Sequence, residues 1–131
     1  MADMAAVCVD PKRIGEVWPH FRERIERAIT KVGLNKIEYV EKDVLAGRSL
    51  LWLAYDGLIV HAAAITQLVG GVCEIVACSG ENLPLFLPLI NDLEQFARDE
   101  NCRAMQISGR KGWIRVLKNY KAKAVILERT L

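Results

Sequence analysis

The fold of this chain is decided by residues 49–78, which read SLLWLAYDGLIVHAAAITQLVGGVCEIVAC. The stretch contains three runs rich in aliphatic and aromatic residues: 49–55, 58–69 and 72–78. Asp56-Gly57 separates the first two runs, and Gly70-Gly71 separates the last two. Such dipeptides favour tight hairpins, because the central residues of those turns need positive φ angles. The stretch therefore predicts a three-stranded antiparallel meander.

The segments before the meander have helical periodicity. Apolar residues recur every three or four positions along residues 10–33, which predicts an amphipathic helix that Asp10 caps. Pro19 lies inside this segment and should kink or split the helix. A second helix is predicted over residues 36–46. Residues 1–9 are expected to form either a flexible N-terminus or a short extra strand.

The segments after the meander alternate between helix and strand. A loop is predicted over 79–82, a long helix from Asn82 to about Asn101, and a strand over 103–108. The helical crossover implies that this strand pairs in parallel with the third meander strand. A short helix over 113–120 and a last strand over 124–127 complete the order α-α-β-β-β-α-β-α-β. We expect an α/β (α+β) fold with a mixed, mostly antiparallel sheet and helices on both faces.

Composition indicates a soluble protein of ordinary type. The 131 residues are 52% hydrophobic and 26% charged, which suits one domain over residues 1–131 with a substantial core. No apolar run is long enough for a membrane helix, and the N-terminus lacks the basic start of a signal peptide, so a cytoplasmic location is expected. The four cysteines form no Cys-x-x-Cys pair and only two histidines are present, so no metal site is expected.

Charge is distributed unevenly along the chain. Residues 103–131 hold eight basic residues and one acidic residue, a net charge of +7, whereas residues 1–102 carry −5. Such asymmetry is compatible with an anionic partner, including nucleic acid. It is equally compatible with the solvated face of a short helix and its flanking strands, and the second interpretation is the simpler one.

The order of elements resembles the acyl-CoA-dependent N-acetyltransferase superfamily, the GNAT fold. Three local patterns are similar to the small GNAT-like proteins of phages and prophages. They are Gly47-Arg48-Ser49-Leu50-Leu51-Trp52, then Glu94-x-x-Ala97-Arg98-x-x-x-Cys102, then Ile107-Ser108-Gly109-Arg110-x-Gly112-Trp113-x-Arg115-x-Leu117. Some of those proteins are associated with virions and most have no assigned activity. The resemblance thus implies a structural or interaction protein that associates with phage structural proteins or with itself.

The resemblance also implies where a cofactor would bind. Members of the superfamily hold the pyrophosphate of acetyl-CoA in a loop with two small residues between the third meander strand and the long helix. Only one glycine stands there in this chain, Glu81 adds negative charge, and Pro84 removes an N–H donor. These departures predict weak cofactor binding or none. In an enzyme, the cofactor-binding residues would be Ala77, Cys78, Ser79, Gly80 and Asn82.

Candidate acid and base residues are few. The superfamily commonly uses a tyrosine on the short late helix as general acid, but Lys118 stands at that position here and Tyr120 follows two residues later. Glu74 is the one carboxylate inside the meander and is the candidate base. Both residues also have ordinary structural explanations, as a residue at the edge of the core and a solvent-facing strand residue. His61 is expected to be structural.

A basic and aromatic segment is the remaining candidate site. Arginine beside tryptophan can bind phosphate or stack on a base, and Trp113 could equally anchor the short helix on the sheet. The residues concerned are Arg110, Lys111, Trp113 and Arg115.

Three hypotheses remain open from the sequence. The first, which we favour, is a non-catalytic, virion-associated protein of phage type without a cofactor. The second is an acetyl-CoA-dependent N-acetyltransferase with a degenerate pyrophosphate loop. The third is a nucleic-acid-binding module that uses the basic C-terminal third.

Overall fold

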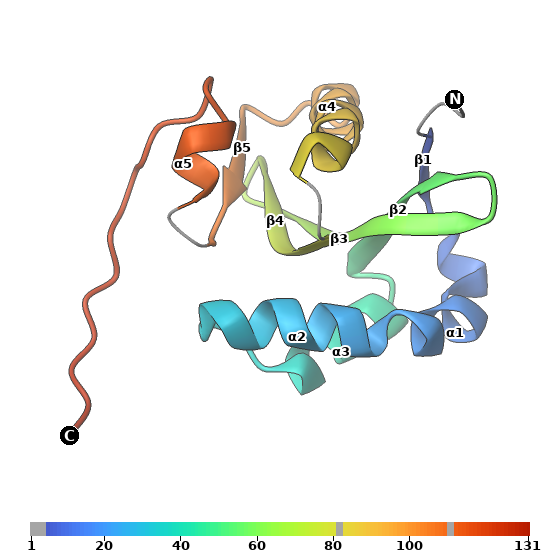
Figure 1. Ribbon diagram of the computed structural model, residues 1–131, viewed down its shortest axis with the longest axis horizontal. Coiled ribbons are helices and arrows are strands. Elements are labelled where there is room, and N and C mark those ends of the chain that lie inside the picture. The colour runs from blue at the N-terminus through green and yellow to red at the C-terminus, as the bar shows by residue number, and fades with distance from the viewer. Residues whose placement is uncertain (1–4, 81–82, 110–111) are drawn as a thin grey trace.

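The computed structural model describes residues 5–80, 83–109 and 112–131, with the backbone alone for 83–85. Its centre is a five-stranded sheet in the order β1-β2-β3-β4-β5 (Figure 1). Neighbouring strands are antiparallel except β4 and β5, which are parallel, as predicted. The strands are β1 (Ala5–Cys8), β2 (Ser49–Asp56), β3 (Ile59–Val69), β4 (Val72–Gly80) and β5 (Ala104–Ile107). The predicted meander is confirmed, and Ala5–Cys8 form a short strand, which was one of the two alternatives expected within residues 1–9.

The two hairpin turns follow from their glycines. Gly57 between β2 and β3 has a φ of +52°, while Gly70 and Gly71 between β3 and β4 have φ values of +56° and +78°. These backbone angles lie in the left-handed region that glycine adopts without steric cost. The turns fix the registers of both hairpins, so that Asp56 pairs with Ile59 and Val69 with Val72.

The N-terminal helical segment is divided into four short elements. They are η1 (Pro11–Arg13), α1 (Ile14–Val17), η2 (Trp18–His20) and α2 (Arg22–Val32). The Asp10 side chain accepts a hydrogen bond from the Lys12 N–H, as expected of an N-cap. Pro19 lies within η2, where its missing N–H ends the regular α-helical bonding, so the predicted split is confirmed. The next helix, α3 (Ile37–Leu45), is close to its predicted bounds.

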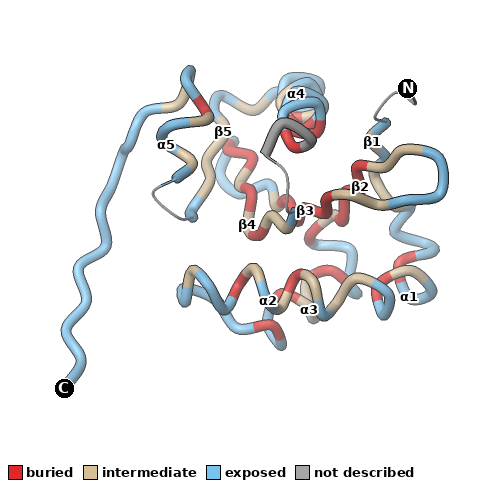
Figure 2. The backbone as a smooth tube through the Cα atoms, in the orientation of Figure 1, coloured by how far each residue is buried: buried red, intermediate tan, exposed pale blue. Residues whose placement is uncertain are grey.

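Two further helices, α4 (Leu83–Asp99) and α5 (Trp113–Val116), lie on the opposite face of the sheet. Figures 1 and 2 show the sheet between these helices and the N-terminal ones, with buried residues concentrated where the layers meet. A hydrophobic core lies on each face of the sheet, and alternate side chains of β2 and β3 pack into one core or the other. Leu51 and Ile65 face α2 and α3, whereas Trp52 and Ala64 face α4. Helices on both faces are thus confirmed.

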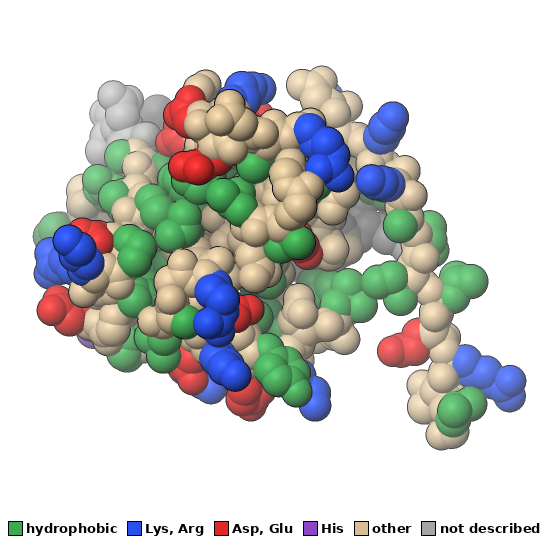
Figure 3. All heavy atoms as spheres, turned by 180° about the vertical axis from the view of Figure 1, so that it is seen from behind, with side chains coloured by type: hydrophobic (Ala, Val, Ile, Leu, Met, Phe, Trp, Pro, Cys, Tyr) green, Lys and Arg blue, Asp and Glu red, His purple; other side chains and the backbone are tan. Residues whose placement is uncertain are grey.

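The end of the chain differs from the prediction. No strand forms over 124–127: residues 121–131 are extended and exposed, and Figure 3 shows them projecting from the body. A strand is stable only when its backbone groups pair with a neighbour, and no described segment lies beside this one. The preceding helix is also shorter than predicted, since it ends at Val116 rather than at Tyr120. Ser79 and Gly80, predicted to lie in a loop, instead end β4 and pair with Ala63 and Ala62.

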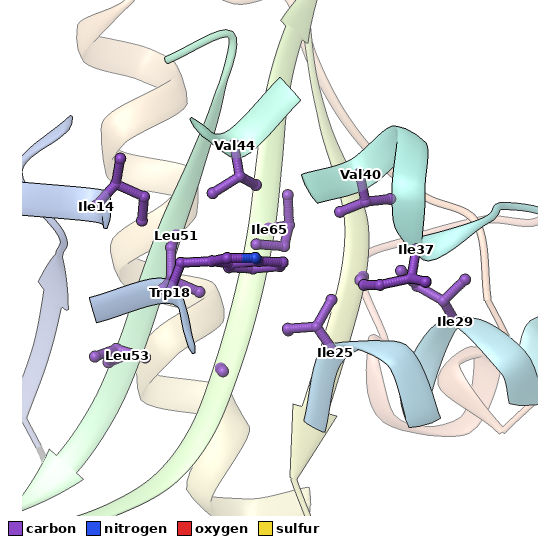
Figure 4. Close-up of a cluster of buried hydrophobic side chains, with 12 residues drawn as sticks. Ile14, Trp18, Ile25, Ile29, Ile37, Val40, Val44, Leu51, Leu53 and Ile65 are labelled. Atoms are coloured by element: carbon purple, nitrogen blue, oxygen red, sulfur yellow. The ribbon is translucent and has the colours of Figure 1, made fainter. Parts of the chain in front are cut away.

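The larger core is centred on Trp18, which is 2% exposed (Figure 4). Side chains from α2, α3 and the sheet surround its ring. The indole Nε1 donates a hydrogen bond of 2.7 Å to Glu41, which also accepts one of 2.7 Å from Arg22. The network ties η2 and α2 to α3, so this side of the sheet carries one connected helical layer.

Within the described residues, none of the helices is both long and apolar enough to cross a membrane.

Candidate functional site

A β-bulge interrupts β4 at Val76. Ile65 of β3 pairs with Ala77, whereas the next residue, Thr66, pairs with Ile75, so Val76 has no residue opposite it. A bulge of this kind bends the strand and increases its local twist. The second half of β4 therefore takes a new direction from Val76 onward.

β4 and β5 part at this bulge. Their parallel pairing ends at Ile75 and Ile107, although β4 continues to Gly80. Residues 77–80 pair with β3 along one edge, and residues 76–80 pair with no described strand along the other. The backbone N–H and C=O groups on that second edge are available to a ligand. We call this opening the β4–β5 wedge.

A narrow pocket of about 30 Å³ occupies the wedge. Strand β4 contributes Ile75 to Cys78, and the end of β5 contributes Ile107, Ser108 and Gly109. Helix α2 closes one side with Ala28, Ile29 and Val32, and Trp113 of α5 closes another. Most of the lining side chains are apolar, although polar atoms make up more of the exposed wall than apolar atoms do. Burial raises the pKa of the Cys78 thiol well above its usual range, so this group stays neutral. The pocket is too narrow for a bulky ligand.

Two glycines make room for an aromatic pair beside the pocket, in which Trp113 lines the pocket and Phe86 packs behind it. Trp113 packs edge-on against Phe86, with ring centroids 5.6 Å apart and an interplanar angle of 82°. A Cβ atom at Gly80 would lie 2.4 Å from the Phe86 ring, and one at Gly109 would lie 2.8 Å from the Trp113 ring. Sequence reasoning considered Gly80 only as part of a phosphate loop and missed both packing roles. Close approach of this kind leaves no signal in a single sequence.

A second and larger hollow, of about 240 Å³, is lined by residues that include Arg48, Thr66 and Glu100. Its strand residues are Leu50 of β2 and Thr66 and Leu68 of β3, and each of them pairs with a residue of a neighbouring strand. The β4–β5 wedge differs because its backbone edge is unpaired, and for that reason we treat the wedge as the candidate site.

The structure distributes the predicted cofactor-binding residues along the end of β4. Ala77 and Cys78 line the wedge, whereas Ser79 and Gly80 follow them and end the strand. Asn82, like its neighbour Glu81, lies outside the described residues.

The predicted acid and base are not brought together. Glu74 precedes the bulge, pairs with Gln67, and alternates with Ile75, which packs toward α4; its side chain therefore lies on the opposite face. Tyr120 packs on the α4 side, where its hydroxyl donates a 2.7 Å hydrogen bond to Glu94. Burial and then this hydrogen bond raise the pKa of Tyr120 above its usual range. Neither residue lines the wedge pocket, and their catalytic roles stay predictions.

The predicted basic site is described only in part. Trp113 lines the wedge and Arg115 is exposed on α5, while Arg110 and Lys111 lie outside the described residues. Binding of an anion or a partner there stays a prediction. His61 has a partner that sequence reasoning did not find, because its Nε2 lies 2.8 Å from an Asp56 oxygen near the β2–β3 turn. In the parts of the chain that the structure describes, no cluster of three metal-ligating side chains occurs.

Comparison with known proteins identifies the fold. No family profile and no curated protein sequence matches the chain. Among solved structures, a predicted acetyltransferase with acetyl-CoA from Clostridium acetobutylicum is similar at a TM-score of 0.66 and 14% identity, covering 98% of this chain and 96% of that one. The GNAT family acetyltransferase of Staphylococcus aureus superimposes over 100% of both chains, at a TM-score of 0.62 and 11% identity. The aminoglycoside N-acetyltransferase AAC(6')-Iy in complex with CoA gives a TM-score of 0.65 at 13% identity, over 99% of this chain and 96% of that one.

The chain therefore has the GNAT fold, as the order of its elements predicted.

Proposed function

We propose that this protein is an acyl-CoA-dependent N-acyltransferase, with acetyl-CoA as the donor, that binds the cofactor's thiol-bearing arm in the β4–β5 wedge. The observation that carries the proposal is the unpaired edge of residues 76–80, opened by the bulge at Val76. The structural similarity to an acetyltransferase with acetyl-CoA and to one in complex with CoA supports the same ligand class.

The residues of the wedge fit this ligand. The arm of an acyl-CoA is a thin chain with two amide groups, and it can add to a free strand edge as an extra strand would. The backbone of Val76, Ala77 and Cys78 would hold those amides, and Ile107 and Trp113 would cover the apolar parts of the arm. When bound, the cofactor supplies an activated acyl thioester for transfer to an amine.

The phosphate groups of the cofactor would bind near the start of α4. Ser79 and Gly80 lead from the wedge toward the start of α4 at Leu83. The free N–H groups at the start of a helix favour phosphate oxygens. The sequence-based expectation that Glu81 and Pro84 weaken this interaction still applies, so the affinity should be modest.

The described pocket residues hold and shield the reacting groups but do not supply a base. They include no carboxylate and no imidazole, and the Cys78 thiol is neutral. The attacking amine would therefore lose its proton to water before it reacts. The rate of acyl transfer should rise with pH until the pH exceeds the pKa of the amine.

The experiment measures thermal stability with and without acetyl-CoA. A ligand at a hundredfold excess over its Kd stabilises the folded state by about 2.7 kcal/mol, which raises the Tm of a domain of this size by roughly 8 °C. Ala28→Phe should fill the pocket from α2 and abolish the rise. Thr30→Phe, on the exposed side of the same helix, is the matched control and should retain it.

The absence of any Tm rise at millimolar acetyl-CoA would contradict the proposal, as would an equal rise with Ala28→Phe. The non-catalytic, virion-associated function that we favoured from the sequence stays a prediction without support from the solved structures named above. Nucleic-acid binding by the basic C-terminal third likewise stays a prediction.

A further inference from the structure

The larger hollow, of about 240 Å³, lies at the far end of α4 from the position proposed above for the phosphate groups of the cofactor. Phe96 of α4 lines it, and so does Glu100, which directly follows the helix. An α-helix rises about 1.5 Å per residue, so Phe96 lies roughly 20 Å along the helix axis from Leu83. None of the described residues that line the hollow also lines the wedge pocket, and the two are separate sites.

A buried residue of the hollow carries a hydrogen-bond donor that the protein does not use. Thr66 lines the hollow, is 1% exposed, and accepts a hydrogen bond of 2.9 Å from Trp52 Nε1. A threonine hydroxyl can also donate one hydrogen bond, and no acceptor for it is found among the described residues. A buried donor without an acceptor costs free energy, which an oxygen atom of a ligand in the hollow would recover.

The remaining strand and helix residues make the hollow apolar. Leu50 and Leu68 come from the strands, and Phe96 comes from α4. An apolar cavity of about 150 Å³ is large enough to bind benzene. The hollow therefore has room for a branched aliphatic or an aromatic side chain, together with part of the molecule that carries it.

Two residues of opposite charge complete the lining, and both are exposed at its surface. The Nε atom of Arg48 donates a 2.9 Å hydrogen bond to Asp43, which orients the guanidinium group. Within the described residues, the two terminal nitrogens of Arg48 have no acceptor, and Glu100 forms no ion pair. One hollow thus offers a cation for a carboxylate and an anion for an ammonium group.

We propose that this hollow binds a free α-amino acid with an apolar side chain. Arg48 would hold the carboxylate and Glu100 the ammonium group, while the side chain of the ligand would pack against Phe96. The unused Thr66 hydroxyl would donate to the same carboxylate, because Thr66 pairs with Leu50, two residues after Arg48 in the chain. The proposal does not depend on cofactor binding.

A titration of the full chain with L-leucine, in the absence of acetyl-CoA and followed by amide NMR shifts, tests the proposal. A ligand of about nine non-hydrogen atoms and ordinary binding efficiency should have a Kd of about 0.1–1 mM. The shifts should centre on residues 66–68 and 96–100. L-Leucinamide lacks the carboxylate and N-acetyl-L-leucine lacks the ammonium group, so each should bind at least about fivefold more weakly.

Variants of the two charged residues separate the contributions of the two ligand groups. Arg48→Gln and Glu100→Gln change exposed side chains, so the fold should survive, as an unchanged pattern of amide shifts elsewhere would show. Each should raise the Kd for L-leucine about three- to tenfold, because one charge-assisted contact is lost. Arg27→Gln and Glu23→Gln make the same changes at exposed positions of α2, away from the hollow, and should leave the Kd unchanged.

Three results would overturn the proposal. The first is the absence of any shift at residues 66–68 and 96–100 with about 10 mM L-leucine, well above the expected Kd. The second is equal affinity for L-leucine, L-leucinamide and N-acetyl-L-leucine, which would show that neither charged group of the ligand is recognised. The third is a Kd that neither Arg48→Gln nor Glu100→Gln changes.

Discussion

Replacing Gly80 by alanine should destabilise the protein by overpacking Phe86, which packs against Trp113 beside the wedge. The added Cβ would lie 2.4 Å from Cε2 and Cζ of Phe86 and 3.2 Å from the His61 carbonyl oxygen. Carbon atoms in contact are normally about 3.5–4.0 Å apart, so the ring would have to move by more than about 1 Å.

The Phe86 ring has little room for that movement. The residue is 2% exposed and packs edge-on against Trp113. Overpacking in such a setting costs about 1–3 kcal/mol of the free energy of unfolding. Gly112→Ala is the matched control, because a Cβ there meets no atom within 4 Å and the residue already has helical angles. It should be neutral or stabilise the protein by up to about 1 kcal/mol.

Urea denaturation of the single variants and of Gly80→Ala combined with Phe86→Leu would measure the effect. Leucine relieves the contact, so the double variant should lose less stability than the sum of the single variants, by about 0.5–3 kcal/mol. If Gly80→Ala is as stable as the unchanged protein, the close packing described here is wrong. If the two changes add within about 0.3 kcal/mol, Phe86 is not the group that the new methyl displaces.

Two further outcomes follow from single hydrogen bonds. Thr66→Val removes the acceptor of the buried 2.9 Å hydrogen bond from Trp52 Nε1, so urea denaturation should show a free energy of unfolding lower by about 1–3 kcal/mol. Thr30→Val, at an exposed position, is the control and should lower the free energy of unfolding by less than about 0.5 kcal/mol. Burial and the hydrogen bond to Glu94 raise the pKa of Tyr120 in the folded state. As the pH rises above about 10, the Tyr120 hydroxyl therefore loses its proton in the unfolded state first. The free energy of unfolding then falls by up to about 1.4 kcal/mol per pH unit. Tyr120→Phe should remove that part of the alkaline loss; an unchanged pH profile would contradict the interpretation.

Local signals in the sequence were sufficient for most of the fold. Gly57, Gly70 and Gly71 adopt positive φ angles, as the hairpin prediction required. The first turn nevertheless consists of Gly57-Leu58 and not of Asp56-Gly57, because Asp56 ends β2 and pairs with Ile59. Pro19 divided the first helical segment where its missing N–H predicted a break. Each of these effects acts within a few residues of its cause, so reading along the chain can detect it.

The candidate site could be predicted only in part. Ala77, Cys78 and Trp113 were singled out and line the wedge. The α2 side of the pocket, which includes Ala28, was not predicted. The apolar periodicity of a helix shows which of its faces is buried but not which strand that face will contact. Glu74 and Tyr120 were considered together, although the alternation of β4 places them on opposite faces of the sheet.

The sequence by itself determined where the helices, strands and turns form, because propensity, periodicity and turn chemistry are local properties. Only the tertiary structure decided which strand edges find partners. The bulge at Val76 ends the contact of β4 with β5 and opens the wedge, and residues 124–127 stay unpaired despite their high β-propensity. Strand pairing joins residues that are distant in the chain, and its stability depends on what lies alongside rather than on the strand's own residues.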